Sequence, residues 1–266
     1  MQRRIFAGLV STLAIAAFAP ATASAQGTIH PGVQTFTQGA QCTANFIFQG
    51  GGSTYIGQAA HCSGTGAATD TNGCDAGTLP LGTPVEINGA TQPGTLSYSS
   101  WIAMQNSGET NADACAYNDF ALVRIAAADV GRVSASVPGY GGPTGVGGPS
   151  ATGATVYSYG NSSLRAGITQ LSPKQGVVVQ TTGNGWSRTV YTVTPGIPGD
   201  SGSGFLDAQG KAIGTLSTVA IAPLPASNGV ADLGRELSYA SSHGTSVSLV
   251  NGGPFNGDIV GAILGS

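Results

Sequence analysis

The chain has 266 residues, of which 8% are charged and 43 are glycine, and its formal net charge is −3. Only nine residues are basic and they are scattered, so the composition argues against nucleic acid and anionic membranes as partners. The length fits one large domain or two subdomains that share an interface.

Residues 1–25 have the pattern of an export signal. Arg3 and Arg4 precede a short apolar run over residues 5–18, and Ala-Ser-Ala at residues 23–25 forms a small-x-small cleavage site. A membrane anchor is the alternative, but the apolar run is shorter than the roughly 20 residues that span a bilayer. We therefore expect cleavage after the signal, a secreted, extracellular protein, and no membrane partner once the signal is removed.

All four cysteines lie between Cys42 and Cys115, and in an exported chain we expect them to form disulfides. Four cysteines allow three pairings, and the sequence alone does not choose among them. Pairing of sequence neighbours gives Cys42–Cys62 and Cys74–Cys115. A zinc site is the competing interpretation, but the sequence has neither Cys-x-x-Cys nor His-Glu-x-x-His spacing, so we expect no metal and no cofactor.

The chain beyond the signal is predicted to be mostly β-structure. Short alternating or β-branched runs recur between glycine-rich turns, a pattern typical of sandwiches and barrels. These runs are residues 44–48, 54–58, 84–87, 120–125, 154–159, 176–180, 187–193 and 211–217. Helical periodicity is confined mostly to residues 232–240, where Leu233, Leu237 and Ala240 share one face.

A Pro/Gly-rich stretch over residues 137–153 separates two β-rich halves, residues 26–136 and 154–243. We expect this stretch to be a strap packed on the surface rather than a flexible regulatory linker. Residues 244–266 form a C-terminal tail that is polar at first and has an apolar run over residues 259–264. For this tail an extra strand, a short helix and a disordered end are open alternatives.

The run Pro198-Gly199-Asp200-Ser201-Gly202 has the composition of a nucleophile loop. A serine hydroxyl needs a base to take its proton and donors to receive the resulting oxyanion. Gly199 can adopt a backbone conformation that aims its N–H at the same point as the N–H of Ser201. An ordinary turn is the competing interpretation, because a glycine-rich chain also produces such a run by chance.

A histidine and an aspartate precede this serine in the chain. His61 lies between the strand-like run 54–58 and Cys62, and Asp119 opens the apolar run 120–123. A packed core histidine and a strand-initiating turn are the competing interpretations. A carboxylate at the mouth of a buried strand needs donors, and an imidazole N–H is one. The order His, Asp, Ser is one of three known orders of an acyl-transfer triad.

Five pieces of the sequence, spread over residues 33–243, carry a family resemblance: Cys42, 59–62, 118–123, 198–202 and 212–217. With these pieces the chain resembles the chymotrypsin/trypsin-like serine proteases, and in particular the compact exported proteases of actinobacteria. The resemblance implies an all-β fold of two six-stranded antiparallel Greek-key β-barrels with a C-terminal helix. It also implies the Cys42–Cys62 bridge.

The resemblance assigns a role to each matching residue. It makes His61 the general base, Asp119 its orienting carboxylate and Ser201 the nucleophile. The N–H groups of Gly199 and Ser201 would form the oxyanion hole. Ser217 would support Asp119 and bind the substrate backbone.

Two departures from the family pattern concern activation and specificity. The family places a freed N-terminus on the aspartate before the nucleophile, here Asp200, but no Ile-Val-Gly-Gly-type start is present. Asp200 therefore needs another partner, and Arg132 and Arg165 are unranked candidates. Pro195 occupies the base of the family's primary pocket, where trypsin-like members carry an aspartate. Val219 stands where glycine commonly keeps that pocket open, so we expect small or medium apolar side chains rather than Lys or Arg.

Together these patterns predict a secreted serine endopeptidase. It would act as a monomer on a peptide or protein substrate, through an acyl-enzyme intermediate. The alternative is a secreted, catalytically weak protease-like binding protein. Two features keep it open: the short segment of 16 residues between Ala25 and Cys42, and the unexplained partner of Asp200.

Overall fold

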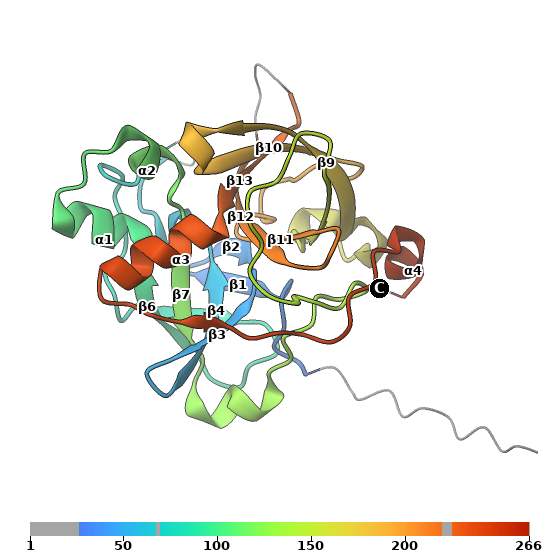
Figure 1. Ribbon diagram of the computed structural model, residues 1–266. Coiled ribbons are helices and arrows are strands. Elements are labelled where there is room, and N and C mark those ends of the chain that lie inside the picture. Colours follow the sequence, from blue (N-terminus) through green and yellow to red (C-terminus); the bar gives the residue numbers. More distant parts are fainter. Residues whose placement is uncertain (1–26, 68–69, 220–224, 266) are drawn as a thin grey trace, which may run out of the picture.

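The computed structural model describes residues 27–67, 70–219 and 225–265, and strands make up most of its regular structure (Figure 1). The expected export signal, residues 1–25, lies outside the described residues. Within the described ranges, no helix has both the length and the apolar character needed to cross a membrane.

The N-terminal half forms an antiparallel sheet in the order β14-β3-β4-β7-β6-β5-β1-β2. Its strands are β1 (Gln34–Thr37), β2 (Ala40–Thr43), β3 (Ile47–Gly50), β4 (Ser53–Gln58), β5 (Pro84–Ile87), β6 (Gly94–Ser99), β7 (Ala121–Arg124) and β14 (Ser248–Leu249). Residues 44–46 lead directly from β2 at one edge to β3 near the other, so one stretch of chain links both ends of the sheet. The buried side chains include Ile47, Ile56, Leu96 and Val123.

The C-terminal half closes into a barrel in the order β10-β13-β12-β11-β8-β9. Its strands are β8 (Thr155–Tyr159), β9 (Pro173–Thr182), β10 (Ser187–Thr192), β11 (Gly204–Asp207), β12 (Ala212–Val219) and β13 (Asn228–Asp232). Alternate residues point inward along such strands. The barrel core accordingly includes Val178, Val190, Phe205 and Val230, all buried.

Helices are short and lie outside the two β units (Figure 1). The α-helices are α1 (Ser100–Ser107), α2 (Ala112–Tyr117), α3 (Leu233–Ser242) and α4 (Ile259–Leu264). Short 3-10 helices span Ala60–Ser63, Ala127–Arg132, Ser163–Arg165, Thr169–Leu171 and Gly183–Gly185. The predicted helix over residues 232–240 corresponds to α3, which packs against α1 and β12 and so bridges the two halves.

The prediction of an all-β fold with two β units and a C-terminal helix is confirmed. The strand count of the N-terminal unit differs, because eight strands form one sheet where a six-stranded barrel was expected. One of the eight, β14, comes from the C-terminal tail and pairs with the free side of β3. An unpaired strand edge presents backbone donors and acceptors that another segment can satisfy.

The C-terminal tail contains both a strand and a helix, β14 and α4. Between them the tail runs beside the connection, residues 137–153. The Gly252 N–H donates to Pro143 O at 2.8 Å and the Asn256 N–H donates to Tyr140 O at 2.7 Å. Backbone bonds of this kind hold the connection against the tail, and the Tyr140 side chain is buried.

Candidate active site

His61 and Asp119 meet because their strands are neighbours. His61 belongs to the 3-10 helix that follows β4, and Asp119 lies just before β7, which pairs with β4 through Gln58 and Ala121. His61 Nδ1 lies 2.6 Å from Asp119 Oδ2, and the His61 backbone N–H donates to Oδ1 at 2.9 Å. The Ser217 hydroxyl donates to Oδ2 at 2.6 Å. The carboxylate thus has a donor for each oxygen.

The electrostatics of this pair favour a charged aspartate and a basic imidazole. Burial opposes ionisation of Asp119, but the charge of His61 and the hydrogen bonds from His61 and Ser217 outweigh it and lower the pKa of Asp119. Burial alone would lower the pKa of His61, yet the charge and hydrogen bond of Asp119 outweigh it and raise that pKa above 6.5. The imidazole is therefore prepared to take a proton and to be stabilised as a cation.

Ser201 lies on the loop between β10 and β11, beside this pair. The Thr43 N–H donates to Ser201 O at 2.8 Å, and the Gly202 N–H donates to Leu216 O at 2.7 Å. A Cβ on Gly202 would lie 2.8 Å from Ala59 N, so the loop packs directly against the chain that leads to His61. No hydrogen bond joins the Ser201 hydroxyl to His61 within the described residues. Catalytic hydrogen bonds are often long before substrate binds.

Gly199 has a backbone conformation that favours glycine. Its φ is +96°, in the region that L-residues with a side chain rarely adopt. A Cβ at this position would also lie 2.3 Å from Gln41 Oε1. Both observations explain why the loop needs glycine here.

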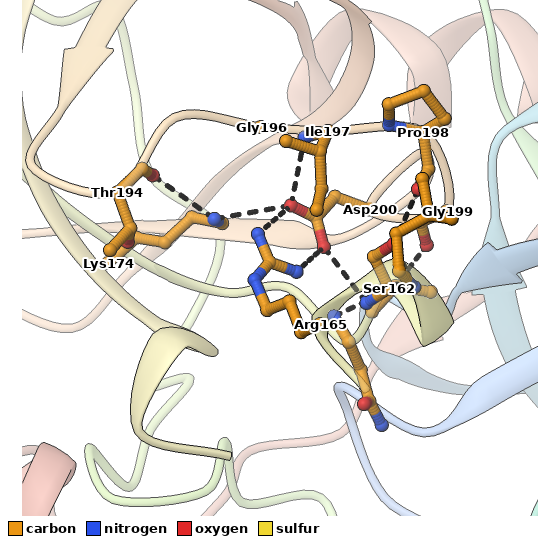
Figure 2. Close-up of polar contacts among 12 residues, drawn as sticks. Ser162, Arg165, Lys174, Thr194, Gly196, Ile197, Pro198, Gly199 and Asp200 are labelled. Atoms are coloured by element: carbon orange, nitrogen blue, oxygen red, sulfur yellow. Dashed lines mark hydrogen bonds and ion pairs between the residues drawn. The ribbon is translucent and has the colours of Figure 1, made fainter. Parts of the chain in front are cut away.

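Asp200 is completely buried and is held by two cations (Figure 2). The two terminal nitrogens of Arg165 lie 2.5 and 2.6 Å from Asp200 Oδ1 and Oδ2, a bidentate arrangement. Lys174 Nζ lies 3.2 Å from Oδ2. The other candidate, Arg132, instead pairs with Asp129 at 3.3 Å and is about half exposed. Of the two arginines left open by the sequence, the partner is Arg165.

Lys174 was missed by the sequence analysis, although it is one of only two lysines in the chain. Its ammonium group donates to Thr194 O and Pro195 O, both at 3.1 Å, in addition to pairing with Asp200. Burial and the nearby charge of Arg165 outweigh the attraction of Asp200 and lower the pKa of Lys174 to about 8. Burial opposes ionisation of Asp200, but the two cations keep its pKa below the usual value.

The expected pocket residues Pro195 and Val219 lie on two segments that approach each other closely. A Cβ added to Gly196 would lie 3.1 Å from Val219 Cγ2 and 3.3 Å from Leu216 Cδ2. The Gly196 N–H donates at 2.9 Å to the side chain of Asn228, a residue that the sequence analysis did not single out. Little room therefore remains between Gly196 and the side chains of Leu216 and Val219.

Both disulfides join sequence neighbours, Cys42–Cys62 and Cys74–Cys115. The Cys42 and Cys62 sulfurs lie within 4.8 Å of a ring nitrogen of His61. Metal binding by cysteine requires thiolates, and these sulfurs are bonded to each other. This cluster is therefore a structural tie beside His61.

A second buried carboxyl, Glu236, lies near Asp119 and was also missed. The Thr215 hydroxyl donates to its Oε2 at 2.9 Å, and its side chain is completely inaccessible. Burial, together with the charges of Asp119 and Asp232, raises the pKa of Glu236 well above 4.5. The pKa of Glu236 is thus shifted in the opposite direction to that of Asp119.

No protein-family model matches the sequence, and no curated protein matches it either. Solved structures do match. Thermobifida fusca Protease A is 19% identical, with a TM-score of 0.53 over 84% of this chain and 99% of that one. The fold is chymotrypsin-like.

Two further structures support the same fold. A glutamic acid-specific serine protease is 19% identical, with a TM-score of 0.52 over 84% of this chain and all of that one. The chymotrypsin of Cellulomonas bogoriensis is 18% identical, with a TM-score of 0.50 over 84% and 98% of the two chains. Likeness at this identity concerns the fold, and function has to be argued from the site.

Proposed function

We propose that the protein is a secreted serine endopeptidase that cleaves peptide bonds through Ser201, His61 and Asp119. The observation that carries this proposal is the Asp119 carboxylate, which binds His61 Nδ1 and the Ser217 hydroxyl beside the loop of Ser201. The chain order His, Asp, Ser is the order of the acyl-transfer triad in chymotrypsin-like folds, and this order supports the proposal.

In the proposed reaction, Ser201 Oγ attacks the carbonyl carbon of the peptide bond while His61 takes the hydroxyl proton. The N–H groups of Gly199 and Ser201 receive the negative charge that develops on the carbonyl oxygen. His61 then protonates the leaving amine, and an acyl-enzyme remains. A water molecule that loses its proton to His61 hydrolyses this ester and frees Ser201.

The alternative of a catalytically weak binding protein rested in part on the unexplained partner of Asp200. Arg165 and Lys174 supply such a partner, so that reason no longer applies. Secretion is supported by the pattern of residues 1–25 and by the two disulfides, which persist in oxidising compartments. The monomeric state stays a prediction that analytical ultracentrifugation would check.

Labelling with a fluorophosphonate tests the nucleophile directly. We expect the reagent to modify Ser201 in the wild type, and Ser201→Ala to abolish labelling and lower turnover by several orders of magnitude. Ser203→Ala is the matched control, because the Ser203 hydroxyl is buried and has no hydrogen-bond partner among the described residues. A wild type that neither reacts nor hydrolyses peptides would overturn the proposal.

The pH dependence tests the role of His61. Because Asp119 raises the pKa of His61, we expect kcat/KM to fall on acidification with a midpoint above 6.5. Asp119→Asn removes that charge, so the midpoint should move to lower pH while kcat/KM drops by orders of magnitude. An unchanged midpoint would contradict the pairing as the source of basicity.

We propose that the residue before the cleaved bond has a small or medium apolar side chain. The proposal is supported by the close approach of Gly196, Leu216 and Val219 and by the lack of a carboxylate at Pro195. A panel of chromogenic peptides would check it, and preference for Arg or Lys would refute it. Val219→Gly should raise kcat/KM for a large apolar residue by about tenfold or more, because it opens the pocket.

A further inference from the structure

The peptide between Pro198 and Gly199 carries one of the two N–H groups that the proposed function assigns to the oxyanion hole. In a trans peptide the N–H and the C=O point in opposite directions. Whatever holds the Pro198 carbonyl therefore also sets the direction of the Gly199 N–H. Gly199 does not fix this direction by itself, because glycine adopts positive and negative φ about equally readily.

Ser162 holds this carbonyl. Its hydroxyl donates to Pro198 O at 2.5 Å, and Figure 2 shows the contact beside Asp200. The same hydroxyl oxygen accepts the Leu164 N–H at 3.1 Å, so its one proton is left for Pro198. The Ser162 backbone N–H donates to Asp200 Oδ1 at 3.1 Å, and the residue is 3% exposed. The donor is therefore fixed in place and shielded from water.

The carbonyl on the other side of Gly199 is held as well. Gly199 O accepts from the Thr43 hydroxyl at 2.7 Å and from Gln41 Nε2 at 2.9 Å. Thr43 Oγ1 in turn accepts the Asn161 N–H at 3.0 Å. Both carbonyls that flank Gly199 are thus bound, and the two sets of donors come from β2 and from the loop after β8.

If Ser162 only capped a helix, its hydroxyl would not need to donate a proton to Pro198 O. Ser162 is the N-cap of the 3-10 helix Ser163–Arg165, and capping uses only its oxygen as an acceptor. Donation of the hydroxyl proton to Pro198 O is a separate contact, made to a carbonyl whose peptide supplies one of the two proposed oxyanion donors.

We propose that Ser162 is a positioning residue of the oxyanion hole, which keeps the Pro198 carbonyl turned away and so keeps the Gly199 N–H directed toward the developing oxyanion. This inference rests on the proposed function. Without the hydroxyl, the carbonyl can turn, and a carbonyl oxygen would then stand where a donor is needed. The loss is felt in the transition state, where the oxyanion carries its charge.

The test compares Ser162→Ala with Ser162→Thr, which retains a hydroxyl, and with the matched control Ser158→Ala. Ser158 is also buried and donates to a backbone carbonyl, Gly204 O, at 2.8 Å. We expect Ser162→Ala to lower kcat about 10- to 100-fold with little change in KM, and to weaken a peptide boronic acid inhibitor in parallel. Ser162→Thr should restore most of the activity, and Ser158→Ala should lose stability without this loss of kcat.

Crystal structures of the variants supply a readout that does not need activity. The Pro198 carbonyl should leave its wild-type orientation in Ser162→Ala and keep it in Ser158→Ala. The inference would be overturned by an unchanged orientation of the Pro198 carbonyl in Ser162→Ala, or by equal losses of kcat in Ser162→Ala and Ser158→Ala. In either case, peptide hydrolysis by the wild type would still uphold the proposed function. A wild type without hydrolysis or labelling would overturn the proposed function, and the assignment of Ser162 to an oxyanion hole with it.

Discussion

In the N-terminal half, the segments beside His61 and Asp119 are tied by covalent bonds, whereas in the C-terminal half the loop of Ser201 is tied by charges. Cys62 follows His61 directly, and Cys115 lies four residues before Asp119. The C-terminal half has no cysteine. There Asp200, the neighbour of Ser201, is bound by Arg165 and Lys174.

The two kinds of tie differ in what they depend on. A disulfide stabilises mainly by restricting the unfolded chain, so its effect depends on the redox state and on loop length. A buried ion pair must offset the desolvation of both charges, so removing either partner leaves an uncompensated charge. The N-terminal half should therefore respond to reduction, and the C-terminal half to the loss of a single charge.

The largest effect on stability is expected from Arg165→Met. This change removes both guanidinium bonds to the buried Asp200 carboxylate and should lower the free energy of unfolding by about 3–5 kcal/mol. Arg132→Met is the matched control. Arg132 is about half exposed, and its buried partner Asp129 keeps its hydrogen bonds from Thr91 and Gln92, so this change should cost less than Arg165→Met. Urea denaturation measures both, and equal losses would contradict the ionic tie.

Removing the two disulfides one at a time should give the larger loss of stability in one variant and the larger loss of activity in the other. The Cys42→Ala/Cys62→Ala variant should lose about 3 kcal/mol and the Cys74→Ala/Cys115→Ala variant about 4 kcal/mol, since the bridged residues are 20 and 41 positions apart. Activity should fall more in the first variant, because its bridge adjoins His61. Urea denaturation and peptide hydrolysis under one condition would check this, and a larger activity loss in the second variant would contradict it.

Lys174→Met should change how stability depends on pH. The pKa of Lys174 is about 8 in the folded protein and near 10.5 in the unfolded chain, so between these values the unfolded chain binds more protons. Wild-type stability should therefore rise relative to the variant from pH 8 to pH 10.5, by an amount on the order of 2 kcal/mol. Parallel stability curves for the two proteins would show that Lys174 does not titrate in this way.

The smallest effect is expected from Glu236→Gln. Burial raises the pKa of the Glu236 carboxyl and so favours its neutral form, and glutamine retains an oxygen to accept the Thr215 hydroxyl. The change should cost less than about 1 kcal/mol and leave the acid midpoint of kcat/KM unmoved. A cost above 2 kcal/mol would mean that this carboxyl is ionised and belongs to the charge-dependent ties.

The β-strand runs and the predicted helix over residues 232–240 could be predicted because burial on one face leaves a local period in the sequence. The pairing of the cysteines could be proposed but not chosen, since spacing allows three pairings. Lys174 escaped prediction because a single lysine in a strand usually faces solvent. Ser162 belongs to no motif, and only its contact with Pro198 distinguishes it.

The sequence by itself determined the types and order of the residues proposed for chemistry, the glycine needed at Gly199 and the all-β class. Chain order, neighbouring residues and short periods carry that information. Only the tertiary structure decided that Arg165 rather than Arg132 binds Asp200, that Lys174 joins it, and that Ser162 holds the Pro198 carbonyl. These contacts join residues that lie 26 to 36 positions apart, and they depend on how separate segments pack, which no local pattern encodes.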